Sequence, residues 1–228
     1  AVGKAIAKTG VNRADLFIAT KVWVTDASYE GAKAAIRRSM DNLGVDYIDL
    51  YLIHQAMGDY IGAWRAITEA YKEGKIRAIG VCNFYPHRLA DFCETVDELP
   101  AVNQVELHPF FQQENALSLM REYGVQPEAW APFAEGRNGI FTHPVLTKIG
   151  EKYGKGAGQV ALRWNTQRGV AVIPKSVHKE RMEQNLDIWD FRLTDEEMAE
   201  IAALDIGRSE IIDHTDPRLV QALHGRKL

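Results

Sequence analysis

Short apolar runs alternate with amphipathic stretches along the whole chain. The apolar runs predict six β-strands, at residues 16–23, 47–54, 76–84, 102–107, 125–131 and 170–174. These runs are apolar throughout rather than at every second position, which is typical of parallel strands covered on both faces.

Helices are predicted between the strands, where apolar residues recur at helical spacing. They cover residues 1–7, 28–43, 62–73, a segment from Pro86, 114–123, a segment from Pro144, 159–168, a segment through 181–185, and 194–204. Thr194 and Glu197 have the spacing of a capping box at the start of the last helix. The tail from Asp205 onward is expected to be irregular.

Strict alternation of strands and helices predicts parallel strands joined by right-handed crossovers, in either an open doubly wound sheet or a barrel. No Gly-x-Gly-x-x-Gly motif follows the first strand, which argues against a dinucleotide-binding open sheet. Polar side chains instead gather at strand ends, as in a (β/α)8 TIM barrel. Only six of the eight strands are found. We therefore expect one barrel domain over residues 1–228, truncated at its N-terminus, with two strands on ~45 upstream residues.

Composition narrows the class of protein and its surroundings. The 228 residues carry a formal net charge of −4, so nothing indicates a nucleic acid or an anionic membrane as partner. Two cysteines, Cys82 and Cys93, do not make a disulfide framework and fit a reducing compartment. No run approaches the ~20 apolar residues of a membrane span, and no signal peptide opens the chain. We expect a cytoplasmic protein, with a monomer as the default.

The segment 172–181 has the features of an anion site. A strand ends at Lys175 and Ser176, a helix follows, and Arg181 lies in that helix. The free N–H groups and the positive dipole end of the first helical turn favour an anion, and the two cations suit a phosphate. Taken alone, the pattern is explained better by an ordinary turn with surface charges, and the rest of the chain shifts the balance toward an anion site.

Five further side chains lie in or near strand ends: Lys21, His54, Asn83, Gln104 and Trp130. Each has an ordinary explanation: an edge lysine, a buried histidine, two amides that cap the backbone, and a packed indole. Placed around one cavity, Lys21 could instead lower the pKa of a neighbouring acid, and His54 could donate a hydrogen bond to a carbonyl oxygen. Asn83 and Gln104 could bind a carboxamide, and Trp130 could stack on an aromatic ring.

In order along the chain, the residues match the motifs of one enzyme family. The matching segments are Thr20-Lys21-Val22-Trp23, Leu52-Ile53-His54, Gly80-Val81-Cys82-Asn83-Phe84, Asn103-Gln104-Val105-Glu106-Leu107-His108-Pro109, and Ile173-Pro174-Lys175-Ser176-Val177 with Arg181 and Asn185. The chain resembles the aldo-keto reductase family, most closely its bacterial members of the 2,5-diketo-D-gluconate reductase type. The resemblance implies a (β/α)8 barrel that reduces aldehydes or ketones with NADPH and uses no metal.

The resemblance also implies a role for individual residues. Lys21 and His54 match two of four catalytic residues, and Trp23 matches a wall of the substrate pocket. Three residues match the family positions that hold the nicotinamide carboxamide: Cys82, Asn83 and Gln104. Trp130 matches the aromatic residue that stacks on the nicotinamide ring, and Ala131, Pro132 and Phe133 continue along the pyrophosphate. The positions that bind the adenosine 2′-phosphate and the adenine in the family correspond here to Lys175, Ser176, Val177, Arg181, Gln184 and Asn185.

The chain departs from the family pattern in three places. Cys82 stands where serine is usual, Trp130 where tyrosine is commoner, and the catalytic tyrosine and aspartate are expected upstream of Ala1. The predicted function is therefore NADPH-dependent reduction of small carbonyl compounds such as dicarbonyls or keto-sugars. One alternative is a nicotinamide dinucleotide-binding protein or fragment without turnover. A weaker alternative is an aldolase-like barrel in which Lys21 forms a Schiff base.

Overall fold

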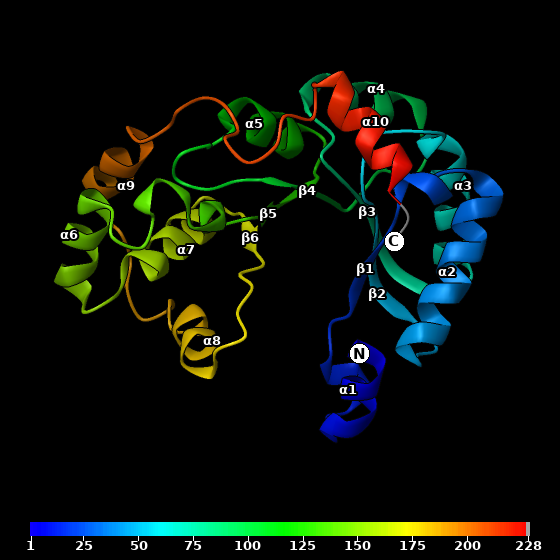
Figure 1. Ribbon diagram of the computed structural model, residues 1–228, viewed down its shortest axis with the longest axis horizontal. Coiled ribbons are helices and arrows are strands. Elements are labelled where there is room, and N and C mark those ends of the chain that lie inside the picture. Colours follow the sequence, from blue (N-terminus) through cyan, green and yellow to red (C-terminus); the bar gives the residue numbers. More distant parts are fainter. Residues whose placement is uncertain (227–228) are drawn as a thin grey trace. The chain divides into compact units, whose positions relative to one another are not determined.

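The computed structural model describes residues 1–226 and has an α/β fold with six parallel strands that follow one another in chain order (Figure 1). The chain consists of two compact units. Unit 1 comprises residues 1–103, 123–125 and 214–226, and unit 2 comprises residues 104–122 and 126–213. The prediction of a single domain over 1–228 stays a prediction.

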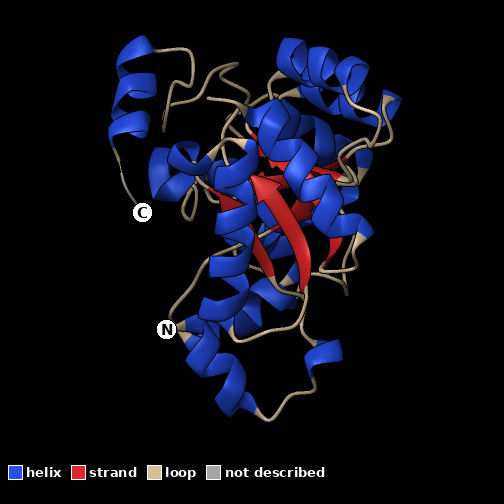
Figure 2. Ribbon diagram, turned by 90° about the vertical axis from the view of Figure 1, so that its right-hand side faces the viewer, coloured by secondary structure: helices blue, strands red, loops and turns tan. Residues whose placement is uncertain are grey.

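Unit 1 contains the first three strands and the helices that follow them. Its elements are α1 (Val2–Thr9), β1 (Ala19–Val22), α2 (Tyr29–Leu43), β2 (Ile48–Ile53), α3 (Tyr60–Lys72), β3 (Ile76–Cys82), α4 (Pro86–Thr95) and α10 (Pro217–Gly225), with 3-10 turns η1 (Arg13–Asp15) and η2 (Val24–Asp26). All six residues of β2 are buried, which explains its unbroken apolar run. Figure 2 shows helices in front of the strands.

The strands of unit 1 pack closely enough that one position excludes any side chain. A Cβ on Gly80 of β3 would lie 2.5 Å from the backbone oxygen of Val102, so only glycine fits there. Behind the strands, the ring of Phe92 lies 5.0 Å from Phe84 and 5.1 Å from Trp64, centroid to centroid, in edge-on geometry. These aromatic contacts fix α3 and α4 against the sheet.

The buried carboxylate of Asp49 joins the beginnings of three strands. Its Oδ2 accepts from Arg13 Nη2 at 2.7 Å and from the backbone N–H of Ile18 at 2.9 Å, and its Oδ1 accepts from Arg77 Nη1 at 3.2 Å. Burial alone would raise the pKa of Asp49, but these donors outweigh it and hold the pKa below its usual range. The ion cluster therefore stabilises the end of the sheet opposite the strand ends that carry the candidate site.

Unit 2 holds the second half of the sheet. Strand β4 (Val102–Glu106) begins in unit 1 and ends in unit 2. The remaining elements are α5 (Glu114–Glu122), β5 (Gln126–Trp130), the 3-10 segment η3 (Ala134–Gly139), α6 (Pro144–Tyr153), α7 (Ala157–Gln167), β6 (Ala171–Val172), α8 (Lys179–Leu186) and α9 (Asp195–Ala202). The parallel pairing of β5 with β6 aligns Glu128 with Ala171.

The structure confirms the predicted α/β fold and the capping box of α9, in which Thr194 Oγ1 accepts from Glu197 N at 3.2 Å. Two expectations are wrong in detail. The sixth strand is only Ala171–Val172, and Lys175 and Ser176, which were expected to anchor an anion, follow it in irregular backbone. The tail is irregular as expected from Asp205 to Asp216, but α10 then covers Pro217–Gly225, and its Leu223 packs on Trp23 and Val24 of unit 1.

Candidate functional site

In unit 1, the residues after β1 and β2 bring a tryptophan and a histidine into contact. His54 directly follows β2, and its N–H donates to Val22 O at 3.1 Å. The rings of Trp23 and His54 lie 4.9 Å apart in a T-shaped arrangement. The Trp23 indole N–H donates to Arg226 O at 2.7 Å, so α10 and its end fix this ring.

His54 is held in its neutral form by its surroundings. Burial is the main cause, and repulsion from Lys21 and His214 adds to it, so that the pKa of His54 falls to about 4. At neutral pH the imidazole therefore carries no charge and keeps one N–H donor. A neutral donor beside a cationic lysine can orient a carbonyl oxygen without taking the proton itself.

The amide of Asn83 is positioned at the end of β3 by an uncommon backbone conformation. Its φ of 60° lies in the left-handed region, which asparagine tolerates better than most residues. Its Nδ2 donates to His54 O at 3.3 Å and to Gln55 Oε1 at 3.4 Å. The neighbouring Cys82 is only 1% exposed. Lys21, Trp23, His54 and Asn83 are thus gathered at the strand ends of unit 1.

In unit 2, Gln104 is buried on β4 and donates its amide N–H to Glu128 of β5. Trp130 ends β5, and the chain then turns sharply: Ala131 and Ala134 have φ values of 47° and 48°. Positive φ at two alanines is strained, and such strain is held only where surrounding contacts fix the loop. Pro132 is buried inside this turn.

Beyond the turn, Phe133 lies on a cavity of about 590 Å³ within unit 2. The cavity brings together seven of the residues predicted from the sequence, namely Phe133, Lys175, Ser176, Val177, Arg181, Gln184 and Asn185. Gln104, Trp130, Ala131 and Pro132 do not line it. Within residues 1–226, neither Lys175 nor Arg181 forms a hydrogen bond or an ion pair, so both cations remain available to a ligand.

The beginning of α8 forms part of the same cavity. The N-cap residue His178 has no side-chain cap, while Ser176 Oγ accepts from His178 N at 3.1 Å. Uncapped N–H groups at a helix start, beside two unpaired cations, favour binding of an anion of phosphate size. The residues of the expected anion site therefore line one cavity, and the anion itself stays a prediction.

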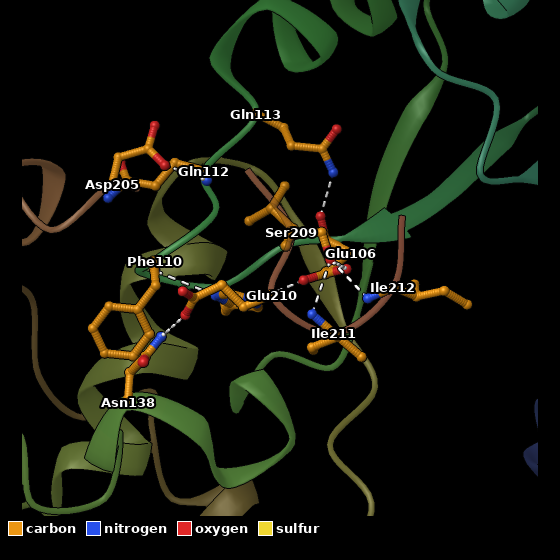
Figure 3. A network of polar contacts seen from close by, with 12 residues as sticks. Glu106, Phe110, Gln112, Gln113, Asn138, Asp205, Ser209, Glu210, Ile211 and Ile212 are labelled. Atoms are coloured by element: carbon orange, nitrogen blue, oxygen red, sulfur yellow. Dashed lines mark hydrogen bonds and ion pairs between the residues drawn. The ribbon is translucent and has the colours of Figure 1, made fainter. Parts of the chain in front are cut away.

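A polar network that was not predicted surrounds Glu106 at the end of β4 (Figure 3). The carboxylate is fully buried; its Oε1 accepts from His108 Nε2 at 3.0 Å and its Oε2 from Ser209 Oγ at 2.6 Å. Ser209 Oγ in turn accepts from the N–H groups of Ile211 and Ile212 at 3.1 and 3.0 Å. The network holds the segment after α9 against the end of β4.

Two further cavity residues, Phe141 and His178, were also missed. The Phe141 ring lies 5.3 Å from the Phe133 ring, centroid to centroid, although the sequence shows it only as an apolar residue in a glycine-containing loop. His178 stands three positions from both Lys175 and Arg181, and this spacing was a signal that the sequence did offer.

The model of the Aldo/keto reductase family matches residues 1–206. Methylglyoxal reductase DkgA of Escherichia coli (strain K12) is 42% identical over 210 residues, which cover 91% of this chain and 76% of the relative. A putative 2,5-diketo-D-gluconic acid reductase B has a similar structure, with a TM-score of 0.89, 36% identity, and coverage of 94% of this chain and 76% of the other. An aldo-keto reductase of Bombyx mori, solved in complex with NADP, gives a TM-score of 0.86 at 34% identity, covering 95% of this chain and 78% of the other. In the part of the chain that the structure describes, no helix is long and apolar enough to cross a membrane.

Proposed function

Because the chain belongs to the aldo/keto reductase family, we propose that it takes part in the NADPH-dependent reduction of small carbonyl compounds, with dicarbonyls and keto-sugars as the substrate class. The observation that carries this proposal is the cavity with the unpaired Lys175 and Arg181. The relative from Escherichia coli is named for methylglyoxal, a small dicarbonyl, and the Bombyx mori relative binds NADP. Both support the substrate class and the cofactor proposed here.

The residues of the cavity fit the adenosine end of NADPH. Lys175 and Arg181 would bind the 2′-phosphate, with Ser176 and the uncapped start of α8 as additional donors. The side chains left for the adenosine are those of Val177, Gln184 and Asn185, and Phe133 stands where the pyrophosphate path would enter. The bound cofactor supplies the hydride, and the protein supplies position and electrostatics.

In unit 1, we assign Cys82 and Asn83 to the binding of the nicotinamide carboxamide. In unit 2, we assign Gln104 to the same chemical group and Trp130 to stacking on the nicotinamide ring. Gln104 donates its N–H to Glu128, which leaves its carbonyl oxygen to accept from a carboxamide. Neutral His54 would donate to the substrate oxygen, with Trp23 as a wall of the substrate pocket. The positive charge of Lys21 would lower the pKa of an adjacent acid.

Neither Tyr47 nor Tyr51 of unit 1 is suited to donate the proton of this reaction. Tyr51 is unsuited to the role, because it is fully buried and burial raises its pKa to about 12. Tyr47 is partly covered by Arg13, whose guanidinium lies 3.8 Å from the ring centroid. Because neither tyrosine fits the role of proton donor, the second candidate function is the binding of NADPH without turnover.

Two measurements on the same sample separate these functions. Binding is followed by the fluorescence of NADPH, and turnover by the loss of NADPH absorbance with methylglyoxal. A reductase binds NADPH and oxidises it only when the carbonyl compound is present. Binding without oxidation identifies the second function, and absence of NADPH binding refutes both.

The variant His54→Gln provides the matched control for turnover. It keeps one hydrogen-bond donor but changes its position, so we expect binding of NADPH to be retained and turnover to fall roughly a hundredfold. An unchanged turnover would show that His54 takes no part in the reaction.

A further inference from the structure

We propose that His178 is a third ligand of the 2′-phosphate, which binds it as an imidazolium and thereby makes the preference for NADPH over NADH depend on pH. The assignment rests on the proposed function, because it takes the cavity of Lys175 and Arg181 as the 2′-phosphate site. It concerns a residue to which the motif pattern gave no role.

His178 lines the same cavity as both cations, and within residues 1–226 its side chain has no other partner. Lys175, His178 and Arg181 all line the same 590 Å³ cavity. The backbone of His178 is held by Ser176, whose Oγ accepts from His178 N at 3.1 Å and donates to His178 O at 3.3 Å. Within residues 1–226 the imidazole itself forms no hydrogen bond and no ion pair.

Few other charges face the imidazole. From the elements opposite α8, the described lining residues are Phe133, Phe141, Gly156, Ala157, Gly158 and Gln159, none of which is ionisable. The first turn of α8 carries an exposed acid, Glu180, and Lys179 pairs with Glu183 at 3.7 Å outside the cavity lining. Without cofactor, Lys175 and Arg181 give the cavity lining two positive charges that no described acid pairs with.

Cofactor binding changes this balance of charges. A phosphate monoester has a second pKa near ~6, so above pH 6.5 it is mainly a dianion. The dianion neutralises Lys175 and Arg181 and attracts a proton onto His178, because an opposite charge at hydrogen-bond distance favours the imidazolium. The complex with NADP therefore takes up a proton, whereas a cofactor without the 2′-phosphate leaves His178 neutral.

The direct test is isothermal titration calorimetry of NADP⁺ and NAD⁺ between pH 6.5 and 8.5. Repeating each titration in buffers of different ionisation enthalpy gives the number of protons taken up. Three variants accompany the wild type: His178→Gln, which keeps a neutral donor; His178→Lys, which keeps a charge at every pH; and Lys179→Gln, which removes a neighbouring cation outside the cavity lining.

For the wild type we expect uptake of about half a proton per NADP⁺ near pH 7 and an affinity about three- to tenfold higher at pH 6.5 than at pH 8.5. His178→Gln should abolish the uptake and flatten the profile, whereas His178→Lys should bind tightly at both pH values without uptake. Lys179→Gln should keep the uptake. NAD⁺ should show no uptake with any of these proteins.

Equal proton uptake by the wild type and His178→Gln overturns the assignment of His178. The proposed function fails differently: if Lys175 and Arg181 do not bind the 2′-phosphate, NADP⁺ and NAD⁺ bind equally at every pH. If NADP⁺ is preferred but its affinity does not change with pH, the proposed cofactor site is supported and only the role of His178 is refuted.

Discussion

The ion cluster at Asp49 gives the most exacting test of how unit 1 is held together. The carboxylate is 3% exposed and accepts from Arg13, Arg77 and the backbone N–H of Ile18. Arg13 is 22% exposed and also donates to Leu16 O at 2.7 Å and Tyr47 O at 2.8 Å, whereas Arg77 is 62% exposed. The two arginines should therefore contribute very differently to stability.

Substitution Asp49→Asn keeps the shape but removes the charge, leaving Arg13 partly buried beside a neutral amide. Breaking a buried pair costs about 3–5 kcal/mol of the free energy of unfolding. Arg13→Met removes charged hydrogen bonds, at ~1.5–3 kcal/mol each, while Asp49 keeps the Ile18 and Arg77 donors, so we expect a loss of about 2–3 kcal/mol. Arg77→Met removes an exposed pair and should cost less than about 1 kcal/mol.

Urea unfolding at pH 7, followed by circular dichroism, gives these free energies, and repeating it down to pH 2 adds the pH dependence. The pKa of Asp49 is lowered in the folded protein, so its contribution is complete above the unfolded pKa of ~4 and is lost as pH falls through the folded value. The difference in the free energy of unfolding between wild type and Asp49→Asn should therefore decrease as the solution becomes acidic. An Asp49→Asn variant as stable as Arg77→Met at pH 7, or a difference in stability that does not narrow at all as the pH falls below ~4, would refute this account of the cluster.

Two further predictions concern unit 2. Thr194→Ala removes the cap of α9 and should lower the free energy of unfolding by ~1 kcal/mol, whereas Thr194→Ser should retain it; equal urea midpoints for all three proteins would contradict the role of the capping box. Ser209→Ala removes both the donor to Glu106 and the acceptor of the Ile211 and Ile212 N–H groups, so amide hydrogen exchange at these two residues should quicken roughly tenfold. Unchanged exchange would show that the segment is held by other contacts.

Much of the fold could be predicted because its strands are continuous apolar runs and its helices have periodic apolar faces. β2 is the clearest case, since every residue is buried and the run has no polar break apart from Asp49. The α10 helix was missed although Asp216 and Pro217 supply an N-cap and a first-turn proline. Its amphipathic face is short, and packing against Trp23 stabilises it more than local propensity does.

The candidate site was predictable only where motif residues lie near one another in sequence. Lys175, Ser176 and Arg181 fall within seven positions and line one cavity. Phe141 lines the same cavity from a distant loop, and Ser209 reaches Glu106 across 103 positions. Partners brought together by tertiary structure leave no local pattern, so one sequence read by itself gives no signal for them.

The proposed preference for NADPH depends on the 2′-phosphate site formed by Lys175 and Arg181. Its most direct test compares the dissociation constants of NADPH and NADH, by cofactor fluorescence, for wild type, Lys175→Met, Arg181→Met and the control Lys179→Met, which alters a cation outside the cavity lining. Each cavity variant should weaken NADPH binding by about tenfold or more and change NADH binding far less, because charged hydrogen bonds to phosphate are worth ~1.5–3 kcal/mol. The control should resemble the wild type. Equal losses for both cofactors in the cavity variants would contradict the central claim.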